Sequence, residues 1–109
     1  MANFEARMSA EPGRITVSLA GECDLSAREH LTAVLLDALQ RSDTVCVDLA
    51  GLTFLDSSGV HSLITAHHAA KPRGARVYVV RATGPVAAVL ELTGLDTLLR
   101  APAEERRHG

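Results

Sequence analysis

The sequence predicts one α/β domain built on a mixed sheet, and three observations support this prediction. The apolar periodicity gives the order strand-strand-helix-strand-helix-strand-helix, which requires right-handed crossovers and mostly parallel pairing, with a hairpin at one edge. The 109 residues suit a single compact domain. The hydrophobic share of 47% contains only 3% aromatics, which is typical of aliphatic helices packed on a sheet. We expect four to five strands and about three to four helices.

An N-terminal hairpin opens the predicted domain. Phe4, Ala6 and Met8 alternate with polar residues, and Ile15–Leu19 alternates in the same way with period two. The stretch Glu11–Arg14 between them contains Pro and Gly and predicts the turn.

The first helix is expected to begin at Ser26 and to end near Arg41. Ser26 is a favourable N-cap residue, and Glu29 three positions later completes a capping-box pattern. The residues at helical spacing are Leu31, Val34, Leu35, Ala38 and Leu39.

A buried central strand and a second helix follow. The apolar run Val45–Leu49 is typical of a strand covered on both faces. We expect Gly51–Leu55 to be a connection. The second helix is indicated by Val60, Leu63, Ile64 and His67 and ends near Lys71.

The sequence pattern of the C-terminal third predicts one more strand and one more helix. Arg76–Val80 reads as a strand, and Gly84 and Gly94 bracket a helix. Leu98–Leu99 is expected to add a short edge strand, through which a weak dimer could form, so we expect a monomer or a weak dimer. One domain is predicted over residues 1–109, with a core over about residues 4–100 and a flexible tail over residues 101–109.

Composition excludes several classes of function. A net charge of −2, with two Phe and one Tyr, gives no basic patch and no stacking surface for nucleic acid. No window approaches the roughly 18 apolar residues of a membrane-spanning helix. The N-terminus does not resemble a secretory signal, so direct membrane insertion is not expected and a cytoplasmic location is predicted. Cys23 and Cys46 are predicted to be buried, reduced thiols.

The junction Asp56-Ser57-Ser58-Gly59 lies where the second helix should begin. Ser57 or Ser58 could cap the helix, because a hydroxyl there accepts a bond from a free backbone N–H group. Alternatively one of them is phosphorylated, since a helix N-terminus favours the added negative charge. The sequence leaves both interpretations open.

Enzymatic chemistry is not indicated. Asp56, Ser57 and His61 fall within one or two helical turns and cannot form the oriented chain of a catalytic triad. No phosphate-binding glycine loop occurs, and the histidines lack ligand spacing, so no cofactor or metal is expected.

Three motifs together resemble a known family. They are Gly21-Glu22-Cys23-Asp24, the stretch Val47-Asp48-Leu49 followed by Phe54-Leu55-Asp56-Ser57-Ser58-Gly59, and Leu92-Thr93-Gly94-Leu95. Over roughly residues 13–99 the chain resembles the bacterial anti-sigma factor antagonists, small STAS-domain proteins that release a sigma factor by capturing an anti-sigma factor.

The resemblance implies a phosphorylation switch. In similar proteins the anti-sigma factor is a serine kinase that uses ATP and Mg²⁺, and a PP2C-type phosphatase reverses the modification. The implied phosphorylation site is Ser57, with Ser58 as second choice. The implied partner-binding residues are Glu22, Asp24, Asp56, Ser57, Ser58, Gly59 and His61.

The chain departs from the family pattern at two places. His61 stands where a second glycine is common, either as an exposed helix residue or as a partner for phosphorylated Ser57, one turn away. The C-terminus offers only Ala103–Arg107 for a final helix, at most one or two turns. Two other classes remain open: a STAS subunit of a membrane transport system, and an enzyme that uses Ser57 directly, which serine-reactive probes would label.

Overall fold

The sheet has four strands in sequence order. The computed structural model describes residues 3–103. The strands β1 (Phe4–Glu11), β2 (Arg14–Cys23), β3 (Thr44–Leu55) and β4 (Arg76–Val80) lie in the order β1-β2-β3-β4. The β1–β2 pair is antiparallel, and the β2–β3 and β3–β4 pairs are parallel. This arrangement confirms the predicted mixed sheet with an N-terminal hairpin.

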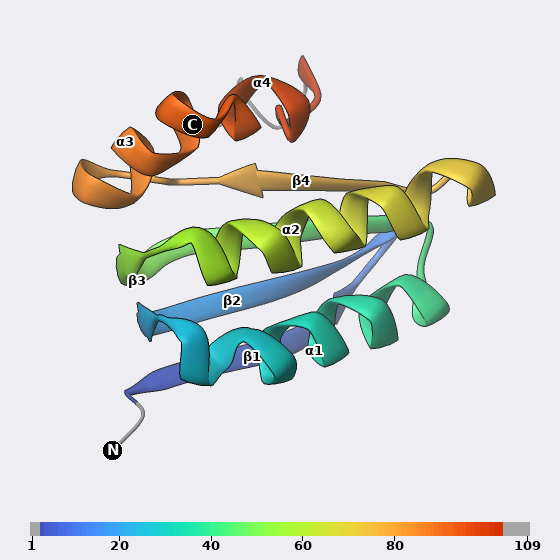
Figure 1. Cartoon of the computed structure of the whole chain (residues 1–109). Coiled ribbons are helices and arrows are strands. Elements are labelled where there is room, and N and C mark those ends of the chain that lie inside the picture. Colours follow the sequence, from blue (N-terminus) through green and yellow to red (C-terminus); the bar gives the residue numbers. More distant parts are fainter. Residues whose placement is uncertain (1–2, 104–109) are drawn as a thin grey trace.

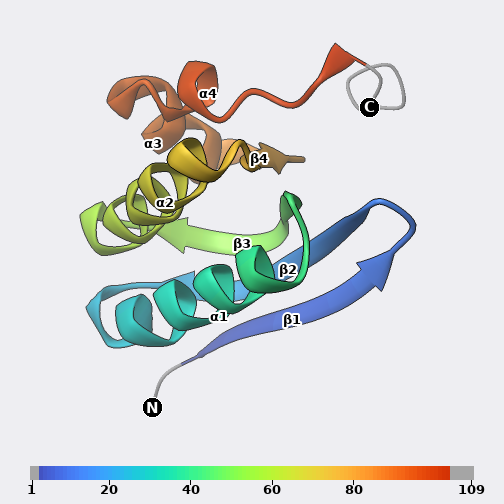
Figure 2. The same cartoon turned by 90° about the vertical axis from the view of Figure 1, so that its right-hand side faces the viewer.

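Helices occupy the connections between the strands. The 3₁₀ turn η1 (Leu25–Ala27) leads into α1 (Arg28–Arg41), and α2 (Ser57–Ala70) leads into η2 (Lys71–Arg73). After β4 come α3 (Gly84–Thr93) and α4 (Leu95–Leu98). Helices α1 and α2 lie side by side along the sheet, while α3 and α4 lie beyond β4 (Figures 1 and 2).

The core lies between the sheet and these helices. Alternate strand residues such as Val17 and Val47 point into it, and Leu35 of α1 and Leu63 of α2 meet them, all with no exposed surface. Burial of such side chains is worth about 1.5–3 kcal/mol each. On the opposite sheet face, Cys46, Tyr78 and Ala101 form a smaller buried cluster. Strand β3 is therefore covered on both faces near Cys46, as its apolar run predicts.

The predicted connection over Gly51–Leu55 is wrong, because β3 continues as a strand to Leu55. Its ladder with β2 is irregular between Ser18 and Ala20 and again between Gly21 and Glu22. These irregularities shift which residues face the core, so the simple alternation that marks a strand in the sequence is lost.

The predicted strand at Leu98–Leu99 is also wrong. Gly94, with φ +78°, ends α3 and starts the short helix α4. Leu95 and Leu99 lie four residues apart and are both buried, which is helical spacing. One backbone bond, from the Val79 N–H to the Leu99 carbonyl (3.0 Å), links this segment to β4. The strand proposed as a dimer contact does not form.

The described elements begin with β1 at Phe4 and end with α4 at Leu98. Among residues 3–103, no helix is both long and apolar enough to cross a bilayer. Ala101 packs in the smaller cluster. Residues 104–109 of the predicted tail, and with them most of the final turn predicted over Ala103–Arg107, lie outside the described residues.

Candidate functional site

The candidate site lies where β2 and β3 end side by side. Cys23 and Leu55 are partners in the parallel ladder, and Asp24 and Asp56 follow them directly. The Asp56 N–H donates to the Cys23 carbonyl (3.2 Å), which keeps the two turns adjacent. The carboxyl end of a parallel sheet is where open α/β folds usually present their functional residues.

Both turns are capped by their aspartates. Asp56 has φ −112° and ψ −170°, and its Oδ1 accepts from the Ser58 N–H (2.9 Å). Asp24 has φ −112° and ψ −168°, and its Oδ1 accepts from the Ser26 N–H (3.0 Å) and hydroxyl (2.6 Å). The two turns thus repeat one conformation. A carboxylate also favours the positive end of the following helix, which explains the choice of residue.

The predicted serine caps are therefore wrong. Asp56, and not Ser57 or Ser58, caps α2, and Asp24 caps η1 in place of Ser26. Helix α1 begins at Arg28 with no side-chain cap, so no capping box with Glu29 forms. The Ser57 side chain is exposed, and its hydroxyl has no hydrogen-bond partner among residues 3–103.

Gly59 allows α2 to lie directly on the strand ends. A Cβ at this position would stand 2.3 Å from Leu55 Cδ1 and 2.7 Å from Cys23 Sγ, which is closer than side chains can approach. Gly59 is buried for this reason. The glycine that the motif predicts at the helix start thus has a packing role, and it brings Ser57 close to the neighbouring turn.

The thiol beneath this glycine stays protonated. Burial, followed by the negative charges of Asp56 and Asp24, raises the pKa of Cys23 to about 11. Cys23 and Cys46 are both buried and neither forms a disulfide, which confirms the predicted reduced thiols.

Sequence reasoning missed Ser62, which fastens the site to α1. Ser62 has no exposed surface. Its hydroxyl accepts from the Thr32 hydroxyl (2.8 Å) and lies 3.1 Å from the Arg28 carbonyl and 3.4 Å from the Ser58 carbonyl. Its position between Val60 and Leu63, inside the apolar pattern of α2, could have indicated that this serine is buried.

The structure separates the predicted site residues into exposed and covered groups. Glu22, Ser57 and His61 are exposed, while Asp24, Asp56 and Ser58 are partly exposed and Gly59 is buried. His61 follows Ser57 by one helical turn, so the two lie on the same side of α2. Two exposed apolar side chains, Leu25 and Phe54, accompany this group and were not predicted.

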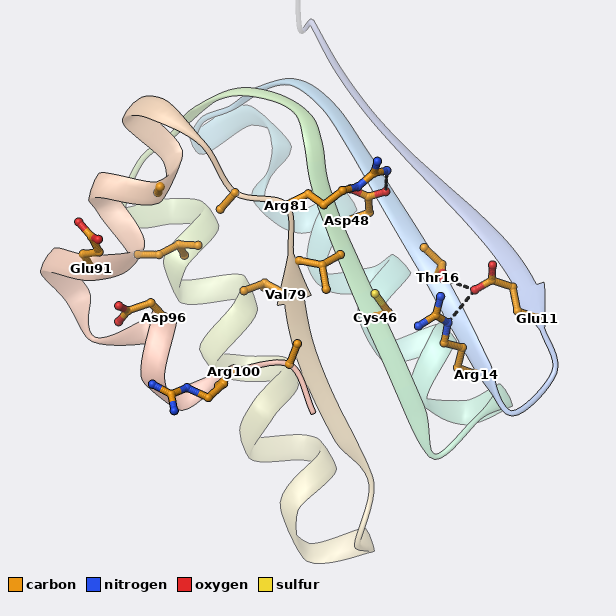
Figure 3. A pocket seen from close by; sticks show the side chains of 15 residues that line it. Glu11, Arg14, Thr16, Cys46, Asp48, Val79, Arg81, Glu91, Asp96 and Arg100 are labelled. Carbon is orange, nitrogen blue, oxygen red and sulfur yellow. Dashed lines mark hydrogen bonds and ion pairs between the residues drawn. The ribbon is translucent and has the colours of Figure 1, made fainter. Parts of the chain in front are cut away.

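A second charged feature lies across the sheet. Arg81 adopts φ +60° directly after β4, and its guanidinium pairs with the Asp48 carboxylate. Partial burial opposes ionisation of Asp48, but the hydrogen bonds from Arg81 and Ala50 hold its pKa below the ordinary value. The pair borders a cavity of about 800 Å³ that extends to Glu91 and Arg100 (Figure 3). No three His, Cys, Asp or Glu side chains gather to hold a metal ion in the described part of the chain.

The mixed sheet and its two aspartate-capped turns define an α/β domain of the STAS class. A family model described as "Mlab, STAS domain" matches residues 6–100. The chain belongs to the STAS domain family.

Individual relatives fit this assignment. An anti-sigma F factor antagonist of Paenibacillus polymyxa is 26% identical over 99 residues, which are 89% of this chain and 85% of the relative. The unphosphorylated anti-sigma factor antagonist SpoIIAA superposes with a TM-score of 0.78 at 23% identity, covering 94% of this chain and 92% of that one. A sulfate transporter family protein from Wolinella succinogenes gives 0.65 at 16% identity, covering 77% and 69%. The two structural likenesses show a shared fold.

Proposed function

We propose that this protein is an anti-sigma factor antagonist controlled by phosphorylation of Ser57. The unmodified chain binds an anti-sigma factor that is also a serine kinase, and a sigma factor is thereby freed. The observation that supports this function is the Ser57 hydroxyl at the first residue of α2, directly after the capping Asp56: it is exposed and has no hydrogen-bond partner in the described part of the chain. The named relative from Paenibacillus polymyxa supports the same class.

Electrostatics explain how the modification would act. A phosphate on Ser57 adds about −1.5 to −2 charges at the N-terminus of α2, where the helix dipole favours them, so the fold tolerates the change. Asp56 and Asp24 already place two carboxylates beside this position. A partner surface that accepts a neutral hydroxyl would then meet a dense negative charge. A penalty of about 3 kcal/mol weakens binding roughly a hundredfold.

The proposal assigns the chemistry to the partners. The kinase supplies ATP and Mg²⁺, a PP2C-type phosphatase removes the phosphate, and this chain acts as a binding module in the cytoplasm with no catalytic role and no cofactor. Among residues 3–103 the Ser57 hydroxyl makes no hydrogen bond to a side-chain base, which suits a phosphate acceptor better than an activated nucleophile.

The test is intact-mass measurement of the protein incubated with ATP, Mg²⁺ and each candidate kinase from the same genome. We expect one added phosphate, mapped to Ser57, with one kinase. The Ser57→Ala variant should gain none, and the matched Ser58→Ala variant should be modified like the original chain. Phosphate on Ser58 would move the site, and no modification by any candidate would refute the switch.

A subunit of a membrane transport system is the second candidate, favoured by the likeness to the sulfate transporter family protein. Co-purification distinguishes the two. A soluble serine kinase bound to the tagged chain supports the first function, and transporter subunits bound to it support the second.

A further inference from the structure

Four large apolar side chains are exposed in residues 3–103, and they form two groups. Leu25 and Phe54, exposed by 68% and 45%, lie at the carboxyl ends of β2 and β3. Leu92 and Leu98, exposed by 88% and 48%, lie on α3 and α4. Single exposed apolar residues are common, so only their surroundings can give them meaning.

Leu25 is the structural counterpart of Ser57. Each is the first residue after a capping aspartate, the two caps have the same φ and agree within 2° in ψ, and the Asp56–Cys23 backbone bond holds the turns side by side. The capped turn of β2 therefore presents a large apolar side chain where the capped turn of β3 presents a hydroxyl.

Phe54 is exposed on the other strand end. It lies two residues before Asp56, and its ladder partner is Glu22, which is also exposed. Ala50, Gly51 and Thr53 in the same stretch of β3 are exposed as well, but Phe54 is the one large apolar side chain among them. It is not among the side chains that pack on the core.

Acidic groups accompany these two side chains. Glu22, Asp24 and Asp56 lie within the same two strand ends, and Asp24 is held ionised because its hydrogen bonds to Ser26 lower its pKa. Arg28 at the start of α1 is the nearest cation along the chain, so the group carries a net negative charge. A complementary surface must combine apolar area with positive charge.

We propose that Leu25 and Phe54 are the apolar anchors of a docking surface around Ser57, and that the partner meets them with an apolar hollow bordered by Lys or Arg side chains. The proposal of this Leu25–Phe54 surface rests on the proposed function in one respect: the partner distinguishes phosphorylated from unphosphorylated Ser57. Apolar anchors remove water from their surroundings on binding. The neutral Ser57 hydroxyl, if covered by the same partner, loses little by this dehydration, whereas a phosphate group would lose its hydration shell.

Site-specific photo-crosslinking tests the surface and identifies the partner in the same experiment. The full chain carries p-benzoylphenylalanine in place of Leu25, Phe54, Leu92 or Leu98 and is irradiated in its own host cell. We expect positions 25 and 54 to label one and the same protein, through peptides that contain apolar residues next to Lys or Arg. Positions 92 and 98 are matched in exposure and should not label it.

Affinity measurements with the labelled protein complete the test. Leu25→Ser and Phe54→Ser should each weaken its binding about tenfold or more, while Leu92→Ser and Leu98→Ser should change it less than twofold. Circular dichroism confirms that all four variants fold.

The outcomes separate the two proposals. No common adduct from positions 25 and 54, or equal effects of the two pairs of variants, would overturn the Leu25–Phe54 surface even if Ser57 is phosphorylated. A common adduct with a protein that is not a serine kinase would preserve the surface and refute the proposed function.

Discussion

The backbone amide of Asp56 donates a hydrogen bond to the carbonyl oxygen of Cys23, with 3.2 Å between nitrogen and oxygen. Because these residues end two parallel strands, the bond holds two aspartate-capped turns next to each other. The exposed serine of one turn is thereby placed beside the exposed leucine of the other on a well-supported backbone.

Replacing Ser57 by aspartate should weaken binding of the kinase partner about tenfold, because aspartate adds one negative charge beside Asp56. Ser57→Ala should bind like the original chain and resist phosphorylation. Isothermal titration calorimetry with the partner measures both. Binding of Ser57→Asp as tight as that of the original chain would show that charge does not exclude the partner.

His61 should respond to phosphorylation of Ser57, since it lies one turn further along the same side of α2. A nearby phosphate favours the imidazolium form and raises the histidine pKa. NMR titration of His61 in both forms measures this, and equal pKa values would refute the pairing.

Gly59→Ala should destabilise the protein by about 1–3 kcal/mol, because the new Cβ would overlap Leu55 Cδ1 and Cys23 Sγ. In an exposed helix the same change stabilises by up to about 1 kcal/mol, so the sign is diagnostic. Urea denaturation measures the change. Adding Cys23→Ala should restore part of the loss, and a stabilised Gly59→Ala variant would contradict the close packing.

Arg81 supplies a matched pair of variants that isolates backbone strain. Arg81→Ala and Arg81→Gly both remove the ion pair with Asp48, but only glycine is unstrained at φ +60°. We expect the glycine variant to be more stable than the alanine variant by about 0.5–1 kcal/mol in thermal or urea unfolding. An alanine variant of equal or greater stability would argue against the left-handed conformation.

Asp48 should contribute to acid sensitivity. Its pKa is lowered in the folded chain, so its contribution to the free energy of unfolding is present above the unfolded value of about 3.9 and is lost as the pH falls through the lower folded value. Asp48→Asn should therefore flatten the decline of stability below about pH 4. Urea midpoints across this range, with exposed Asp37→Asn as control, test the expectation.

The sequence predicted the element order and the start of the second helix at the Asp-Ser-Ser-Gly junction, because apolar periodicity and helix-start residues are local signals. It failed where tertiary pairing decides the outcome. Strand β3 continues past Gly51 and Phe54 because it pairs with β2 through two register irregularities. A short helix forms at Leu95–Leu98, where a strand was expected, because Leu95 and Leu99 are buried together at helical spacing.

The hydrogen bonds of the candidate site were not predictable from the sequence. Serine and aspartate are both good cap residues, so only the backbone geometry shows that Asp24 and Asp56 take that role. Ser62 was missed because its contacts with Thr32 and Arg28 join residues about 30 positions apart.

The Ser62 hydroxyl links the first turn of α2 to α1 through interior contacts, whereas Ser57 is exposed. Under the proposed function, the modified and unmodified chains would then keep the same backbone and differ in the phosphate group itself. The lifetime of each form would then be set by the rates of the kinase and the phosphatase. A conformational equilibrium of the chain itself would not contribute to it.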